Sequence, residues 1–130
     1  MKLNLKVMLI IAAIYWILNG LLGLLAPVSM FGIELNASTQ MFLVMAMKFW
    51  GVASLALGVI AWLVRNAEPS KTRDAVVLGS IFYFALEAPV SFYGYFVDPA
   101  SPHVVFAVIE ALIAVGLFLA YRSRQAATAS

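Results

Sequence analysis

Four strongly polar residues lie inside apolar stretches of this chain, and their side chains are the ones that could do chemistry. They are Asn19, Lys48, Glu87 and Glu110. Paired carboxyl groups can act as acid and base, or bind a proton or a cation, where water is excluded. One lysine cannot neutralise two glutamates. If these residues meet, we therefore expect the set to hold a proton or bind a cation.

The sequence that surrounds these residues is typical of a membrane protein. Hydrophobic residues make up 65% of the 130-residue chain and charged residues 11%, whereas soluble proteins have about 45–50% and about 25%. A domain of this length exposes much of its surface, so it cannot bury so many apolar side chains. Lipid must cover the rest, and we predict one integral membrane domain over residues 1–130.

Four apolar segments are long enough to cross a bilayer, which takes about 20 residues of helix. They comprise residues 5–26, 40–64, 75–97 and 102–121. Each of the four polar residues lies in a different segment. The predicted fold is therefore all-α, a membrane-spanning four-helix bundle.

The basic residues predict how this bundle is oriented, because cytoplasmic loops carry an excess of Lys and Arg. Both chain ends and the linker between the second and third segments are basic, whereas the other two connections contain no Lys or Arg. We therefore expect both termini and this linker to be cytoplasmic. The residues concerned are Lys2, Lys6, Arg65, Lys71, Arg73, Arg122 and Arg124.

The polar residues should also lie at similar depths, since a helix rises about 1.5 Å per residue. Counted from the outer end of each segment, Asn19, Lys48 and Glu110 lie about 12 Å deep and Glu87 about 15 Å deep. A lone lysine inside a membrane costs at least about 2.5–3.5 kcal/mol. We expect Lys48 to pair with Glu87, Glu110 or both. The alternative is that Lys48 extends to the outer surface, and the glutamates could equally form a network that only fixes the packing.

Three other residues bear on this polar layer. Tyr83 lies one turn before Glu87, and we expect Tyr83 and Asn19 to orient a ligand as donors, although a bond between helices is the stronger expectation for Asn19. Pro89 frees a backbone carbonyl near Glu87, which favours a kink there, with a cavity or a hinge. His103 stands at the membrane edge, where contact with solvent is favoured over haem ligation.

No established catalytic or cofactor motif occurs in the sequence. The chain has no cysteine and one histidine, which excludes thiolate chemistry and leaves little for a metal site. Phosphate-binding loops, dinucleotide fingerprints and nucleophile elbows are missing. We expect no cofactor, no metal and no nucleic-acid partner, because the basic residues are dispersed along the membrane edges.

Several stretches of the chain are similar to a known group of proteins. They are residues 15–27 (YWILNGLLGLLAP), 31–35 (FGIEL), 48–66 (KFWGVASLALGVIAWLVRN) and 108–122 (VIEALIAVGLFLAYR). They resemble the small, uncharacterised bacterial four-span proteins grouped as DoxX-like or BphX-like. The resemblance implies a multi-pass protein of the bacterial inner (plasma) membrane and no settled activity, so it assigns no site residue.

The leading hypothesis is that the polar layer binds a small hydrophobic or amphipathic ligand in a carrier-like or accessory protein, with a coupled proton. Glu87 and Glu110 would be the proton or cation sites and Lys48 their counter-ion. One alternative is a membrane isomerase or cyclase in which Glu87 and Glu110 are catalytic. Another is a structural subunit. The expected partners are the lipid bilayer, a hydrophobic small molecule, and further copies of the chain or a larger membrane complex.

Overall fold

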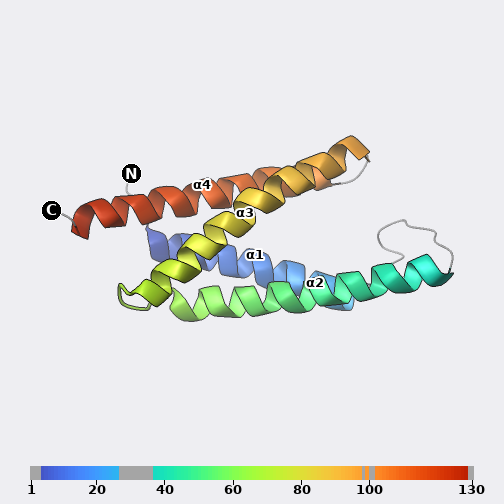
Figure 1. Cartoon of the computed structure of the whole chain (residues 1–130), viewed down its shortest axis with the longest axis horizontal. Coiled ribbons are helices and arrows are strands. Elements are labelled where there is room, and N and C mark those ends of the chain that lie inside the picture. Colours follow the sequence, from blue (N-terminus) through green and yellow to red (C-terminus); the bar gives the residue numbers. More distant parts are fainter. Residues whose placement is uncertain (1–3, 27–36, 98, 100–101, 129–130) are drawn as a thin grey trace.

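The computed structural model describes residues 4–26, 37–97, 99 and 102–128. These residues form four helices in the order α1 (Leu5–Leu25), α2 (Ala37–Val64), α3 (Lys71–Val97) and α4 (His103–Thr128) (Figure 1). All four are long and apolar enough to cross a membrane. The predicted all-α bundle of four membrane-spanning helices is confirmed.

Three helices are longer than the apolar segments that predicted them, and α2 is one of them because it begins at Ala37 instead of residue 40. α3 begins at Lys71 instead of residue 75 because Ser70 caps it: the Ser70 Oγ accepts a hydrogen bond of 3.2 Å from the backbone N–H of Arg73. Asp74 adds a favourable negative charge to the first turn. α4 continues past residue 121 to Thr128. Hydropathy locates the part of a helix that lies in lipid, whereas caps and backbone bonds determine where the helix itself ends.

The bundle consists of two hairpins, α1–α2 and α3–α4. Within each hairpin the two helices pack closely along their length, whereas α2 and α3 make only slight contact. α2 and α3 are joined at one end of the molecule and diverge toward the other (Figure 1). α1 also packs against α4, so α1 is the helix that connects the two hairpins.

Glycines bring the backbones of α1 and α2 into contact. A Cβ atom on Gly51 would lie 2.9 Å from the carbonyl oxygen of Gly20 and 2.9 Å from the backbone nitrogen of Leu24. One on Gly58 would lie 3.1 Å from the carbonyl oxygen of Ala13. Small residues permit such close approach of membrane helices, where dispersion between backbones replaces the hydrophobic effect. This side of α2 therefore faces α1.

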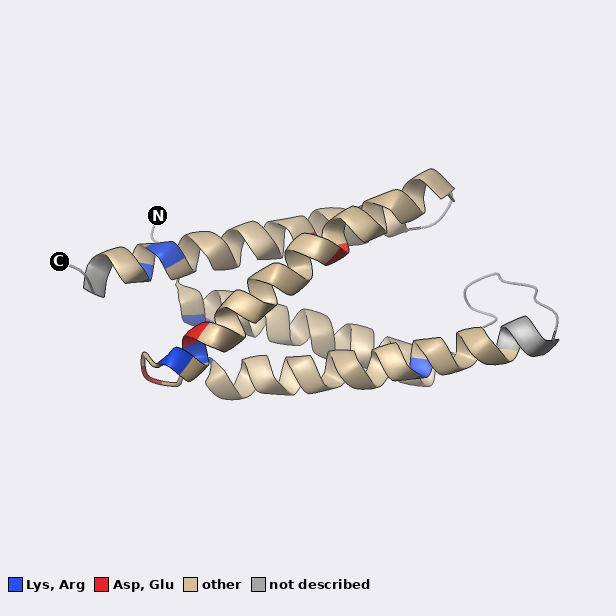
Figure 2. Cartoon of the chain, in the orientation of Figure 1, with Lys and Arg blue, Asp and Glu red and all other residues tan. Residues whose placement is uncertain are grey.

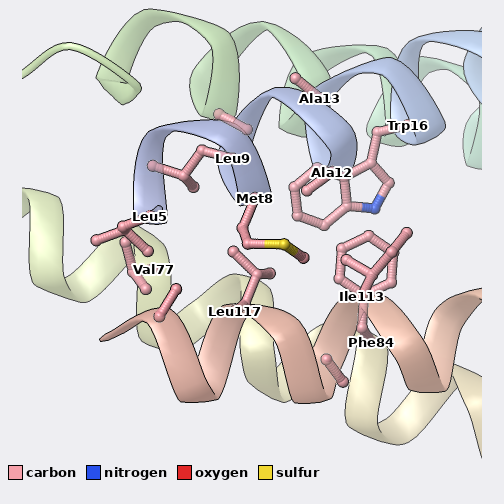
Figure 3. Close-up of a cluster of buried hydrophobic side chains, with 13 residues drawn as sticks. Leu5, Met8, Leu9, Ala12, Ala13, Trp16, Val77, Phe84, Ile113 and Leu117 are labelled. Atoms are coloured by element: carbon pink, nitrogen blue, oxygen red, sulfur yellow. The ribbon is translucent and has the colours of Figure 1, made fainter. Parts of the chain in front are cut away.

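The apolar core lies mainly between α1, α3 and α4 (Figure 3). At its centre the Trp16 indole stacks on the Phe84 ring, with centroids 4.7 Å apart and planes 16° from parallel. Both side chains are almost fully buried. The residues packed around them include Leu5, Met8, Leu9, Ala12, Ala13, Val77, Ile113 and Leu117.

Apart from Lys48 on α2, the basic residues of the described chain gather at one end of the bundle (Figure 2), where α1 begins, α4 ends and α2 connects to α3. Asp74 and Arg124 form an ion pair of 3.8 Å between α3 and α4 at this end. The arrangement agrees with the distribution of Lys and Arg along the sequence. It places the beginning of α1 and the end of α4 on the same side of the bundle.

Candidate functional site

A cavity of about 240 Å³ lies among all four helices. Its polar and aromatic lining comes from α1 (Tyr15, Asn19), α2 (Trp50), α3 (Glu87, Ser91) and α4 (His103, Phe106, Glu110). Three of the residues predicted as site residues, Asn19, Glu87 and Glu110, therefore meet in one place.

Glu110 is the most deeply buried of the acidic side chains at this cavity, with only 3% of its surface exposed. Its Oε1 accepts a hydrogen bond of 2.5 Å from the hydroxyl of Tyr15. Its Oε2 is buried and has no hydrogen-bond partner among the residues that the structure describes. An unpartnered buried acceptor is costly, and this one belongs to a residue that lines an open space.

Glu87 is held in the same way from a different helix. Its Oε1 accepts a hydrogen bond of 2.7 Å from the hydroxyl of Tyr83, one turn earlier on α3. Its Oε2 is also buried and without a partner in the described part of the chain. The Trp50 side chain of α2 lines the same cavity as Glu87. Trp50 is thus the contribution of α2 to this site.

The two tyrosines that hold the carboxylates belong to one aromatic cluster. The Phe84 ring lies 5.5 Å from the ring of Tyr15 and 5.5 Å from that of Tyr83, edge-on to both. Trp16 packs edge-on against Tyr83 at 5.3 Å and stacks on Phe84. Edge-to-face and offset-stacked rings are the favoured geometries for aromatic pairs. The cluster therefore fixes the direction in which each hydroxyl points.

Asn19 lines the cavity, as predicted, but its hydrogen bond does not run between helices. Its Nδ2 donates 2.9 Å to the carbonyl oxygen of Tyr15, in the same helix. The prediction of an interhelical bond is therefore wrong for the described residues. The bond lies one turn from Tyr15 and stabilises the segment that presents the Tyr15 hydroxyl to Glu110.

Lys48 is the main correction to the predicted site. Its Nζ donates a hydrogen bond to the carbonyl oxygen of Leu24, in the last turn of α1, and it pairs with neither Glu87 nor Glu110. The last carbonyls of a helix have no partner within the helix and carry partial negative charge. The close contact of α1 with α2 at Gly51 brings Lys48, one turn away, to the end of α1. Glu87 belongs to α3, which diverges from α2.

Three other predicted residues have mixed outcomes. His103 is exposed, as expected at a membrane edge, but it also lines the cavity. Its ring packs over Gly94, where a Cβ atom would lie 2.9 Å from the His103 Cγ. The helix α3 is continuous through Pro89. Tyr83 binds Glu87 and lines two neighbouring pockets instead of this cavity.

Sequence reasoning missed two residues of the site, Tyr15 and Trp50. A usable signal existed for Tyr15, which precedes Asn19 by one turn as Tyr83 precedes Glu87. That spacing places a phenol and a polar group on one face of a helix. No comparable signal exists for Trp50, because tryptophan is common in membrane helices for reasons of packing.

The chemical character of the cavity is that of a hydrogen-bond acceptor with aromatic walls. Each tyrosine hydroxyl donates a hydrogen bond to the Oε1 atom of its glutamate, while the two Oε2 atoms have no partner among the residues that the structure describes. No Lys or Arg occurs among the described residues that line it. No cluster of three or more His, Cys, Asp or Glu suited to a metal ion occurs in the described ranges either.

Comparison with known proteins gave no match: no family model, curated protein or solved structure is similar to this chain.

Proposed function

We propose that this chain is a carrier-like or accessory membrane protein that binds a small hydrophobic or amphipathic ligand in the cavity between its four helices. Glu87 and Glu110 contact the polar part of the ligand and exchange a proton with it. Tyr15 and Tyr83 hold the two carboxylates, and Asn19 and Trp50 complete the polar wall. Lys48 instead stabilises the C-terminal end of α1 and is not part of the site.

The observation that carries this proposal is the vacant Oε2 of Glu110. A fully buried carboxylate oxygen in a membrane protein is costly without a partner. Glu110 lines a cavity of about 240 Å³ with aromatic walls. A ligand that donates a hydrogen bond would satisfy this oxygen. Intramembrane ionisable groups mark ligand and proton pathways in many membrane proteins.

The test is retention of a bound molecule by the purified protein. The wild-type chain and the Glu87→Gln and Glu110→Gln variants are purified in mild detergent, and molecules bound to them are identified by mass spectrometry. Glu68→Gln serves as the matched control, since Glu68 is exposed in the loop between α2 and α3. We expect a molecule that is enriched in wild type and Glu68→Gln and depleted in the two cavity variants. Equal occupancy in all four proteins would refute the proposal.

A membrane enzyme is the second candidate, and the tyrosine–glutamate pairs favour it. Each carboxyl lines the cavity, accepts a hydrogen bond from a phenol on one oxygen, and has no partner in the described structure on the other. Two such carboxyls could donate and accept a proton on opposite sides of a lipid-soluble substrate, as an isomerase or cyclase requires. Conversion of the retained molecule by wild type, but by neither Gln variant, would establish this function. Retention without conversion leaves the carrier-like function.

The setting of this proposal is the bacterial inner membrane, with both termini cytoplasmic. The gathering of basic residues at one end of the bundle supports the orientation. The bacterial location and the DoxX-like or BphX-like relationship rest on the resemblance alone. If the Gln variants change only yield and oligomeric state, the chain is instead a structural protein that assembles with further copies of itself or within a larger complex.

A further inference from the structure

We propose that the ligand of this cavity is a lipophilic amine, bound in its protonated form by Glu87 and Glu110. The inference rests on the ligand-binding function proposed above and names the chemical class of the ligand. It follows from the charge, the hydrogen-bonding groups and the shape of the space, taken in turn.

The negative charge of the residues that line the cavity favours a cationic ligand. Glu87 and Glu110 line the same cavity, and no Lys or Arg of the described lining compensates their charge. Lys48, the nearest candidate by sequence reasoning, binds the end of α1 instead. Charges interact far more strongly in a membrane interior than in water. One monovalent cation between the two carboxylates would therefore be strongly attracted.

The hydrogen-bonding groups that line the cavity indicate that the ligand donates a hydrogen bond in addition to carrying a positive charge. An ionised carboxylate only accepts hydrogen bonds, and each one here already accepts a tyrosine hydroxyl on Oε1. The remaining buried acceptors among the described lining side chains are the two Oε2 atoms. Trp16, whose buried indole N–H lacks a partner in the described structure, lines a different pocket. A protonated amine supplies both the positive charge and the N–H.

The aromatic walls fit the same class of ligand. Tyr15, Trp50 and Phe106 line the cavity beside the carboxylates. Ring faces attract cations, tryptophan most strongly, and this attraction grows where water is excluded. A headgroup that carries N-methyl groups would keep contact with these rings while its N–H reaches Glu110.

The shapes of two adjoining spaces indicate separate sites for the headgroup and the alkyl tail of the ligand. The cavity, at about 240 Å³, is smaller than the sites of about 300–1,000 Å³ that enclose drug-sized ligands. A second, apolar groove of about 440 Å³ runs along α3 and shares Glu87 and Val90 with it. Gly79 lines this groove, and a Cβ atom there would meet nothing within 4 Å. We place the alkyl tail in this groove, where α3 diverges from α2.

Binding of three probes to the full-length protein in lipid nanodiscs tests the proposal. N,N-dimethyldecylamine is cationic at neutral pH and has one N–H. Decyltrimethylammonium has the charge without the N–H, and decanol has a donor without the charge. Empty nanodiscs of the same lipid measure partition into lipid, which is subtracted. We expect saturable binding of the amine to be about tenfold or more tighter than that of either other probe. Glu110→Gln should abolish this preference and the control Glu68→Gln should retain it.

Two results would overturn the proposal in different ways. If decanol or decyltrimethylammonium binds as tightly as the amine, and Glu110→Gln weakens all of them alike, the amine assignment is wrong and the ligand-binding function stands. If no probe shows saturable binding, both the assignment of the ligand as an amine and the proposed ligand-binding function are refuted.

A second variant tests the position of the tail. Gly79→Leu adds a side chain to the open groove without touching the carboxylates. It should weaken binding of the amine severalfold while the preference for amine over decanol persists. Unchanged affinity in a folded Gly79→Leu protein would place the tail elsewhere and remove that part of the proposal.

Discussion

The hydroxyl of Tyr15 in α1 donates a hydrogen bond of 2.5 Å to Glu110 in α4. This bond joins the first helix to the last across the cavity, where the two hairpins of the bundle meet. It also orients the Glu110 carboxylate so that only one oxygen is left to contact a ligand. Stability and ligand binding are therefore coupled through the same pair of side chains.

Removal of the Tyr15 hydroxyl should destabilise the bundle. Tyr15→Phe leaves both oxygens of a buried carboxylate without a partner in the described structure, which costs about 1–3 kcal/mol. Detergent unfolding of the purified protein measures this loss. Tyr93→Phe is the control, because Tyr93 is 69% exposed and should change stability little.

A double-mutant cycle then separates the hydrogen bond from general packing. Tyr15→Phe, Glu110→Gln and the double variant should show a coupling of about 0.5–3 kcal/mol. Additive effects of the two substitutions would contradict a direct interaction between these side chains.

Replacement of Lys48 should have a modest effect on stability and none on the preference of the cavity for cations. Lys48→Met removes a charge that stabilises the C-terminal end of α1, which is worth about 0.3–2 kcal/mol. Loss of one partner from a buried ion pair would instead cost about 3–5 kcal/mol. Unfolding measurements distinguish the two. A large loss that Glu110→Gln rescues would restore the ion pair that the sequence alone predicted.

The glycine contact between α1 and α2 should not tolerate a larger residue. In Gly51→Leu the new Cβ atom would lie 2.9 Å from backbone atoms of α1, so the helices must separate. Overpacking of this kind costs about 1–3 kcal/mol or more. The matched control is Gly79→Ala, which enters open space and gains helix propensity. Equal stability of the two variants would show that the close approach is unimportant.

The orientation of the bundle can be measured directly, because the chain contains no cysteine. Glu68→Cys marks the connection between α2 and α3, and Pro99→Cys marks the connection between α3 and α4. A membrane-impermeant maleimide added to intact cells should label the Pro99→Cys protein and spare the Glu68→Cys protein. Labelling of Glu68→Cys alone would mean that both termini are outside.

The positions of the polar residues along the chain were sufficient to predict part of the site. Asn19, Glu87 and Glu110 lie at similar depth in separate helices, and helical rise carries that information with no knowledge of packing. The spacing of four residues places Tyr83 and Glu87 on the same face of α3, where they form a hydrogen bond. The pairing of Tyr15 with Glu110 crosses from α1 to α4, and no pattern within one helix could identify it.

Lys48 shows the limit of such reasoning most clearly. Its depth matched that of Glu110, yet depth says nothing about which helices are neighbours. Close packing at Gly51 joins α2 to α1, while α3 diverges from α2 (Figure 1). The lysine therefore reaches the end of α1 instead of a carboxylate.

The sequence by itself determined the four membrane-spanning helices, the end at which their basic residues gather, and the level at which their acidic groups lie. These features depend on hydropathy, on charge and on the rise of a helix, which are properties of each segment alone. The tertiary structure decided which side chains meet: two tyrosines with two glutamates, and a lysine with a helix end. Those contacts depend on how closely and at what angle the helices cross, and that is set by packing between glycines and aromatic rings from distant parts of the chain.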